Sequence, residues 1–292
     1  MTEESAPYGS PRIAAVIGCG SIGRRHAHNL NRLGYAVRTW DLDPARCTVP
    51  TLNEALDGAT LAVIVTPPAA HMEGALAVRD AGVPWLLIEK PLAPSFADAA
   101  MLLSWTQPTI VVGYCLRFAL ATQDLREALP RIAPLRLVEA VYSERPSHRP
   151  AWLEDPIQGG ATLEYSHILD LLLWLFGKPT FVQAQHVGVP DQAVVAALRW
   201  PDGLLGTVRM DFLSPTETRI KVIGDRGVVE WYRDMIVGPG CEKYTEHSAA
   251  WLLHEAEELH AVIKGALPGS PRLCSVEEAL AVLELADHLR AR

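Results

Sequence analysis

The sequence predicts an α/β chain: a doubly wound parallel sheet, then an α+β part with an open, mostly antiparallel sheet. Up to about residue 113, apolar runs suited to buried strands alternate with helical stretches, the rhythm of parallel strands joined by crossover helices. Beyond about residue 114, shorter alternating runs are separated by turns such as P-D-G and G-D-R-G, which indicates antiparallel strands.

Composition restricts the classes of function. At 292 residues the chain is long enough for two domains. Its formal charge of −8 comes from interspersed acids and bases, so neither nucleic acid nor a membrane surface is expected as a partner. The five cysteines are scattered without a C-x-x-C pair, which predicts reduced thiols, no metal site and a cytoplasmic location. Residues 1–10 are polar and lack the order of a signal peptide, so we expect a flexible tail.

The chain is organised around the segment Ile13–Gly23, which reads I-A-A-V-I-G-C-G-S-I-G. An apolar strand leads into glycines with G-x-G-x-x-G spacing and a helix follows, the order of a Rossmann dinucleotide site. Such a turn brings pyrophosphate to bare backbone at the N-terminus of the helix. The alternative is a glycine turn in a sheet protein that binds no nucleotide. The residues expected to contact the cofactor here are Gly18, Cys19, Gly20, Ser21, Ile22 and Gly23.

The second apolar run, Tyr35–Trp40, ends at Asp41, about the right distance downstream to bind an adenosine ribose. A carboxylate there accepts hydrogen bonds from both ribose hydroxyls and repels a 2′-phosphate. The sequence therefore favours NAD over NADP. Thr51–Leu56 is expected to form only a short helix.

Two further strands point polar side chains to the same crevice. Leu61–Val65 ends in T-P-P-A-A-H, and loops at the carboxyl ends of parallel strands face the ligand in a doubly wound sheet. Thr66, Pro67 and His71 are therefore predicted to lie near the cofactor; for His71, an exposed position at a helix start is the alternative.

Pro84–Ile88 delivers Glu89 and Lys90 to this edge, where both are expected to reach the cofactor. A lysine directly between a buried strand and a proline is unusual for a solvated charge. Pro91 also permits a cis peptide bond, which would aim the lysine inward.

The sequence divides into a dinucleotide-binding domain over residues 11–114 and a second domain over 115–292. In the latter, Leu135–Tyr142 is expected to form a half-buried strand, and five antiparallel strands are expected after it: Phe181–Val187, Ala193–Trp200, Gly206–Phe212, Arg219–Gly224 and Val228–Tyr232. Two helices close the chain, Ala249–Lys264 and Ser275–Leu289, the latter with Ser275 as N-cap and Glu278 at capping-box spacing.

A third polar constellation lies in the predicted helix Ala161–Phe176. Glu164, His167 and Asp170 are three residues apart, which would place them on one helix face. Either carboxylate could orient the imidazole and raise its pKa toward useful acid–base chemistry. The alternative is a helix whose polar side merely happens to carry these residues.

Together these segments resemble the glucose–fructose oxidoreductase, inositol dehydrogenase and rhizopine-catabolism family (Gfo/Idh/MocA). The motifs are, in order, G-C-G-S-I-G, T-P-P-A-A-H, E-K-P-L-A, G-Y-C-L-R-F and G-G-A-T-L-E-Y-S-H-I-L-D-L-L-L-W-L-F-G, and they cover most of the chain. The resemblance implies a Rossmann domain, then an open antiparallel sheet that pairs chains into homodimers or homotetramers. It also implies NAD(P)-dependent oxidation or reduction of sugars, cyclitols or related hydroxy compounds.

The resemblance also assigns roles to residues. Lys90 matches the lysine that hydrogen-bonds the reacting oxygen, and His167 matches the general acid/base. Glu164 falls where many members have an aspartate, although that acid is usually one residue further from the histidine. The shorter spacing resembles the branch associated with nucleotide-sugar and amino-sugar pathways. Arg117 matches the arginine of the G-[FY]-x-x-R-F segment and is expected, with Trp152, to contact the substrate.

The segments in which this sequence departs from the family pattern affect the expected size and specificity of the substrate more than the expected reaction. The region between Asp41 and Leu61 is short, and the loop Trp152–Gly159 is trimmed. The neighbouring side chains could grip a phosphate, a carboxylate or a sugar face, or be solvated: Arg145, His148, Arg149 and Trp152. Two alternatives to a dehydrogenase are a non-catalytic sensor that binds a dinucleotide, and an enzyme that uses tightly bound NAD transiently for glycoside cleavage or epimerisation.

Overall fold

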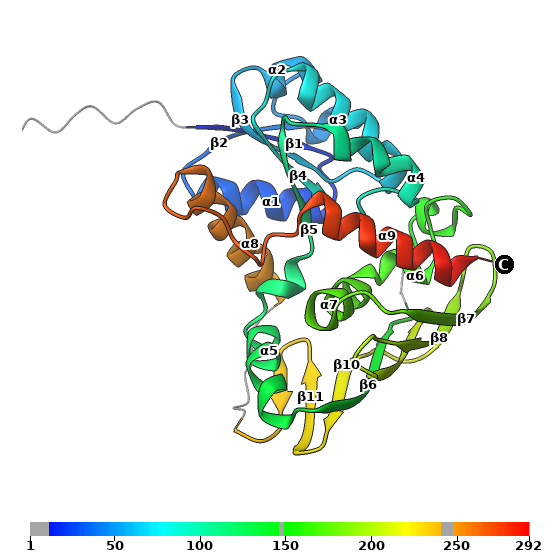
Figure 1. Ribbon diagram of the computed structural model, residues 1–292. Helices are drawn as coiled ribbons and strands as arrows, with labels where there is room; N and C mark the ends of the chain where they lie inside the picture. Colours follow the sequence, from blue (N-terminus) through cyan, green and yellow to red (C-terminus); the bar gives the residue numbers. More distant parts are fainter. Residues whose placement is uncertain (1–11, 146–148, 241–247, 292) are drawn as a thin grey trace, which may run out of the picture.

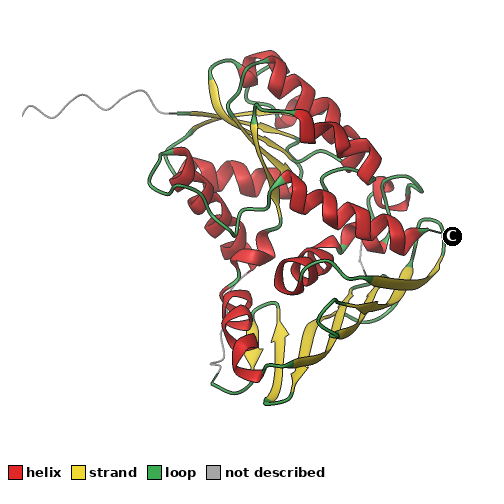
Figure 2. Ribbon diagram, in the orientation of Figure 1, coloured by secondary structure: helices red, strands yellow, loops and turns green. Residues whose placement is uncertain are grey.

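The computed structural model describes residues 12–145, 149–240 and 248–291, which form two sheets with helices between and around them (Figures 1 and 2). The predicted tail over residues 1–10 lies outside the described residues, as does His148. Within the described ranges, no helix is long and apolar enough to cross a membrane.

The first sheet has five parallel strands in the order β2-β1-β3-β4-β5. Its strands are β1 (Ile13–Ile17), β2 (Ala36–Trp40), β3 (Ala59–Ile64), β4 (Trp85–Glu89) and β5 (Thr109–Gly113). The accompanying helices are α1 (Ser21–Arg32), α2 (Leu52–Leu56), α3 (His71–Asp80) and α4 (Phe96–Ala99). The predicted doubly wound parallel sheet is thereby confirmed, and its continuous apolar runs are buried as such a sheet requires.

The second sheet has seven strands in the order β12-β11-β10-β6-β9-β8-β7. Neighbours are antiparallel except for β6 with β9, which confirms the mostly antiparallel prediction. The strands are β6 (Leu135–Ser143), β7 (Phe181–Val187), β8 (Ala193–Arg199), β9 (Leu205–Asp211), β10 (Glu217–Gly224), β11 (Gly227–Tyr232) and β12 (Met235–Val237).

Helices cover one face of the second sheet, and the other face is open. In β8, for example, Val194 is fully buried beneath the helices, whereas Val195 on the opposite face is 52% exposed. The helices of this half are α5 (Leu120–Ile132), α6 (Ala161–Glu164), α7 (Ser166–Phe176), α8 (Ser248–Ile263) and α9 (Val276–Arg290). The capping box predicted for the last helix is present, with Ser275 and Glu278 bonded reciprocally.

The two closing helices return to the first sheet. Figure 1 shows α8 beside α1 and the red helix α9 running between the two sheets. The segment before α9 joins β5 through a hydrogen bond from the Val112 N–H to the Cys274 carbonyl, at 2.9 Å. The second half of the chain therefore packs on both sheets.

Candidate active site

The glycine turn between β1 and α1 has the backbone geometry that a phosphate-binding turn needs. Gly18 has a φ of +92°, and a Cβ there would lie 2.7 Å from the Val65 carbonyl oxygen. A Cβ on Gly23 would overlap the Gly18 carbonyl. By contrast, a Cβ on Gly20 would meet nothing within 4 Å, and no side chain caps the first turn of α1. Open space and uncapped N–H groups thus coincide, which fits a bound pyrophosphate.

Asp41 closes the same turn from the end of β2. Its Oδ2 accepts the backbone N–H of Cys19 at 2.6 Å, and its Oδ1 accepts that of Asp43 at 2.9 Å. The Cys19 thiol is buried, which raises its pKa and keeps it neutral. The carboxylate therefore stands beside the turn, where an adenosine ribose would reach it.

His71 is buried, so the alternative of an exposed helix-start residue is wrong. Its ring nitrogens lie 2.8 Å from the Thr66 carbonyl oxygen and 3.0 Å from that of Pro91. Burial lowers the pKa of His71, so the ring is neutral. This histidine braces the loop after β3 against the loop after β4. The Thr66 hydroxyl beside it is buried and has no partner among the described residues.

Glu89 is held by a residue that the sequence analysis did not single out. His26 of α1 is 1% exposed, and its Nε2 lies 2.7 Å from Glu89 Oε1. The other oxygen accepts the backbone N–H of Lys90. Burial alone would raise the pKa of Glu89, but His26 and Lys90 lower it below the ordinary value, so the group is ionised. The signal for His26 was its position three residues beyond the last glycine, on the face of α1 that meets the sheet.

The side chain of Lys90, which follows β4 of the first sheet, contacts the second half of the chain. Its bond to Pro91 is cis, as the sequence permits. The Nζ donates to the Glu164 carbonyl oxygen at 2.8 Å and to Glu164 Oε2 at 3.1 Å. Burial alone would lower the pKa of Lys90, but the nearby carboxylates raise it above its ordinary value. The ammonium group is therefore charged at neutral pH.

His167 lies next to this ion pair, but not between two carboxylates as predicted. The expected continuous helix is interrupted at Tyr165, so α6 ends at Glu164 and α7 begins at Ser166. Glu164 turns to Lys90 instead, and Asp170 turns away. Burial, Lys90 and Arg233 lower the pKa of His167 well below its ordinary value, so the prediction of a raised pKa was wrong.

The imidazole of His167 is consequently neutral at pH 7. Its ring packs edge-on against Tyr114, with the centroids 5.6 Å apart. Its Nδ1 is buried and has no hydrogen-bond partner among the described residues. A neutral, underused imidazole beside a charged lysine is a suitable acceptor for a substrate proton.

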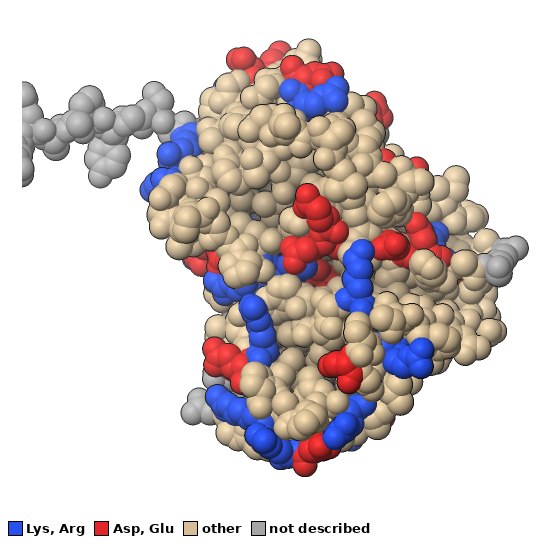
Figure 3. All heavy atoms as spheres, in the orientation of Figure 1, with Lys and Arg blue, Asp and Glu red and all other residues tan. Residues whose placement is uncertain are grey.

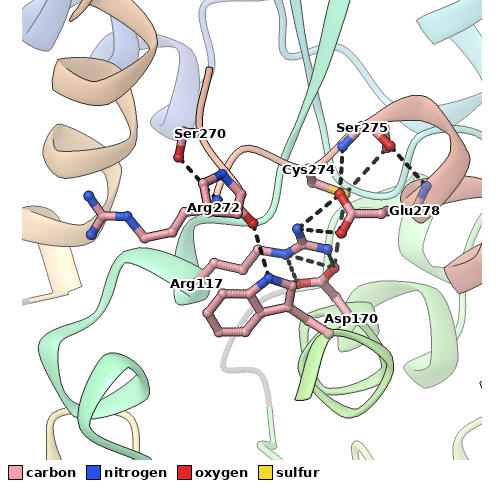
Figure 4. A network of polar contacts seen from close by, with 9 residues as sticks. Arg117, Asp170, Ser270, Arg272, Cys274, Ser275 and Glu278 are labelled. Carbon is pink, nitrogen blue, oxygen red and sulfur yellow. Dashed lines mark hydrogen bonds and ion pairs between the residues drawn. The ribbon is translucent and has the colours of Figure 1, made fainter. Parts of the chain in front are cut away.

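Arg117 is not brought to the crevice, contrary to expectation (Figure 4). Its guanidinium binds Asp170 at 2.6 Å and Glu278 at 3.1 Å, and its side chain is only 1% exposed. Burial raises the pKa of Asp170 to about 6, although Arg117 opposes the shift. The family-type arginine therefore ties together the segment η4 (Cys115–Phe118), α7 and α9 rather than meeting substrate.

Trp152 and the arginines of the predicted specificity loop make contacts within the protein. Trp152, in η5 (Ala151–Glu154), is partly buried against the main core. Arg149 donates to Gln192 at 2.5 Å and stacks over the Phe212 ring at 4.8 Å. Arg145 donates to the Leu213 carbonyl. These arginines fasten the loop to the sheet.

Charged side chains of both signs gather where the two halves meet, as Figure 3 shows for one face of the molecule. Among the described residues, no group of three or more histidine, cysteine or acidic side chains is arranged to hold a metal ion. The described cysteines 19, 47, 115 and 274 are free thiols. The chemistry that the crevice itself offers is thus a charged lysine, a neutral histidine and an open glycine turn.

Comparisons with known proteins agree with this arrangement. Residues 128–230 match the GFO/IDH/MocA C-terminal domain. The chain is 29% identical over 251 residues to the myo-inositol dehydrogenase Hyg17 of Streptomyces leeuwenhoekii, covering 74% of this chain and 75% of that protein.

Two solved structures share the fold. The UDP-N-acetylglucosamine 3-dehydrogenase GnnA of Acidithiobacillus ferrooxidans is 22% identical, with a TM-score of 0.79 over 95% of this chain and 96% of its own. The WlbA dehydrogenase of Bordetella pertussis, solved with NADH and UDP-GlcNAcA, is 21% identical, with a TM-score of 0.79 over 96% of this chain and 95% of its own.

Proposed function

We propose that this chain is a member of the GFO/IDH/MocA family and an NAD-dependent dehydrogenase that oxidises or reduces a sugar-like substrate. The observation that carries the proposal is the meeting of Lys90 from the first sheet with Glu164 and His167 from the second half of the chain. The names of the relatives support the class of reaction, since they are dehydrogenases of a cyclitol and of nucleotide sugars.

The cofactor would be held by the turn from Gly18 to Gly23 and by Asp41, whose carboxylate favours NAD over NADP. The loop from Thr66 to Pro67 would flank it, braced by His71. When bound, NAD supplies the acceptor or donor of a hydride, which no side chain can provide. The NADH in the Bordetella protein supports this choice of cofactor.

Side chains of the protein would transfer the proton and stabilise the charge on the reacting oxygen. In the oxidative direction, neutral His167 removes the proton of the reacting hydroxyl. The Lys90 ammonium stabilises the negative charge that develops on that oxygen. Glu164 keeps the ammonium charged and oriented through two hydrogen bonds, and the His26–Glu89 pair fixes the backbone from which Lys90 projects. In the reductive direction protonated His167 returns the proton to this oxygen, and Lys90 stabilises the same developing negative charge.

The substrate class that fits is a sugar, a cyclitol, or the hydroxyl or carbonyl of a nucleotide sugar or amino sugar. We further propose that the chain forms a homodimer or homotetramer through the open face of the second sheet. Exposed apolar side chains on that face support the proposal.

Thermal unfolding with NAD(H) and NADP(H) in separate titrations tests the cofactor assignment, because a ligand that binds only the folded state raises the melting temperature. We expect a clear rise with NAD(H) and little with NADP(H), followed by NADH formation with a sugar or cyclitol in an absorbance screen. A larger rise with NADP(H) would contradict the role of Asp41. No rise with either would contradict the dehydrogenase.

A further inference from the structure

The inner face of the second sheet carries a row of hydrogen-bonding side chains at its end near Lys90. In the register of the sheet, Tyr142 of β6 lies opposite Thr218 of β10. On the next strand, β11 ends at Tyr232, which lies opposite Arg219, and Arg233 follows in the turn to β12. Arg233 lies over the inner face, because its guanidinium is stacked on the ring of Tyr142.

This row adjoins the reaction centre. The ring of Tyr142 stacks on that of Tyr165, with the centroids 4.3 Å apart and the planes 13° apart. Tyr165 directly follows Glu164, which binds the Lys90 ammonium. The charge of Arg233 also contributes, after burial and Lys90, to lowering the pKa of His167. Groups at this end of the sheet are therefore within reach of a substrate held by Lys90 and His167.

Thr218 is the unsatisfied member of the row. It is 8% exposed, yet its hydroxyl has no hydrogen-bond partner among the described residues. A buried hydroxyl without a partner is costly, so native proteins rarely leave one unused. A ligand atom at this position would satisfy it.

Arg233 is oriented by aromatic rings. Its Cζ lies 5.9 Å from the ring centroid of Tyr142 and 5.5 Å from that of Trp251. Within the described part of the chain, no carboxylate forms an ion pair with it. A guanidinium held in this way presents a planar fork of donors, which matches a carboxylate or a phosphate at two points.

We infer that the substrate is an acidic hydroxy compound whose carboxylate or phosphate binds Arg233 and the Thr218 hydroxyl, while its reacting hydroxyl lies between Lys90 and His167. This inference rests on the proposed dehydrogenase. It makes Arg233 a residue that determines specificity: a neutral polyol would leave the guanidinium and the threonine hydroxyl without their partner. The Tyr142–Tyr165 stack then forms the wall between the acidic group and the reacting carbon.

The test measures binding and needs no turnover. With the protein saturated by NADH, glucose, galactose and N-acetylglucosamine are each compared with the matching uronate and 6-phosphate, by calorimetric titration and melting temperature. We expect at least one acidic sugar to bind tenfold or more tightly than its neutral counterpart. Whether the uronate or the 6-phosphate gains that advantage distinguishes a carboxylate from a phosphate. Equal binding of neutral and acidic sugars, or no binding of any acidic sugar, would overturn the inference.

Variants then locate the effect. Arg233→Met should weaken the acidic sugar about tenfold or more and remove its advantage, Arg233→Lys should retain part of it, and Thr218→Val should cost a few-fold. Arg226→Met is the matched control, because Arg226 is an exposed arginine in the turn between β10 and β11, at the other end of β11 from Arg233, and should change nothing. Undiminished binding of the acidic sugar by Arg233→Met would refute the site.

NADH affinity separates this inference from the proposed function. NADH affinity should be unchanged in all four variants, since none of them touches the glycine turn. Loss of NADH binding by the wild-type protein would instead count against the dehydrogenase itself.

Discussion

Lys90 lies between two carboxylates with different partners. The Glu89 carboxylate pairs with His26, whereas the Glu164 carboxylate pairs with the Lys90 ammonium. The charge of Lys90 is therefore stabilised on the side that faces the second sheet. Lys90→Met should therefore lower kcat by about 10²–10³-fold, as loss of a donor to a developing oxyanion does. NADH affinity, followed by fluorescence, should stay nearly unchanged.

The matched control for Lys90 is Lys178→Met. Lys178 is a lysine with a 67% exposed side chain that also pairs with a glutamate, Glu284. It should retain wild-type turnover in the NADH absorbance assay. Near-normal turnover in Lys90→Met would remove Lys90 from the mechanism.

The lowered pKa of His167 sets the pH dependence of the reaction. Because the folded pKa is well below 6.5, the imidazole is already a free base at neutral pH. We expect kcat/KM for oxidation to stay flat between about pH 8 and pH 6.5 and to fall only at lower pH. A titration of activity centred above pH 6.5 that disappears in His167→Gln would contradict this assignment.

The same shift has a consequence for stability. Below about pH 6.5 the unfolded chain binds a proton at His167 that the folded chain resists. Stability should therefore fall as the pH decreases from about 6.5 toward the folded pKa. His167→Gln should reduce the slope of the denaturation midpoint plotted against pH over this range. An unchanged slope in the variant would mean that His167 is not responsible.

Asp41 should decide between the two cofactors. Asp41→Ala removes a charge that hydrogen-bonds ribose and repels a 2′-phosphate. We expect roughly tenfold or greater weakening of NADH and a smaller penalty for NADPH, since hydrogen bonds to charged groups contribute about 1.5–3 kcal/mol. Asp43→Ala is the control: it removes an equal charge two residues away, from a side chain that pairs with Arg46. Equal losses in the two variants would refute a specific role for Asp41.

At the scale of elements, the sequence patterns predicted strands and helix caps well because these depend on neighbouring residues. The capping box at Ser275 and the short helix after Thr51 are of this kind. The break at Tyr165 was missed because the contact that accompanies it is distant in sequence: the Tyr165 ring stacks on Tyr142 of β6. That break is also why Glu164 and Asp170 did not both end beside His167.

The Arg117–Asp170 pair joins η4 to α7, and it should matter for folding rather than turnover. Both side chains are 1% exposed, so removing one charge leaves the other buried without compensation. We expect Arg117→Met to lower the free energy of unfolding by about 3–5 kcal/mol. Arg136→Met, in an exposed pair with Asp225, should leave it nearly unchanged. Equal effects on denaturant midpoints would show that the buried pair is not a structural tie.

At the scale of the whole molecule, the crevice depends on contacts that no local motif encodes. The sequence resemblance paired Lys90 with His167, but nothing in its motifs pointed to Tyr142, Thr218 or Arg233. Tyr142 and Thr218 become neighbours only through the register of β6 with β10, and Arg233 joins them from the turn between β11 and β12. Likewise, α8 and α9 pack near the first sheet because their apolar faces must be buried. The apolar pattern of a helix predicts which of its faces is buried, but not which sheet that face packs against.

The open face of the second sheet exposes apolar side chains. Around a depression of about 450 Å³, it exposes Leu137, Phe181 and Leu205 to between 42% and 48%. An apolar face of this kind is typical of an interface, and a second copy of the chain would cover it with the same residues by two-fold symmetry. Light scattering should give a multiple of the chain mass of 31.9 kDa.

Leu205→Asp should return the assembly to one chain mass, because it would bury a charge at the centre of the contact. Leu103→Asp, at a similarly exposed leucine beside the first sheet, should leave the mass unchanged. A wild-type protein of single chain mass at micromolar concentration would contradict the interface. An assembly that survives Leu205→Asp would mean that a different surface joins the chains.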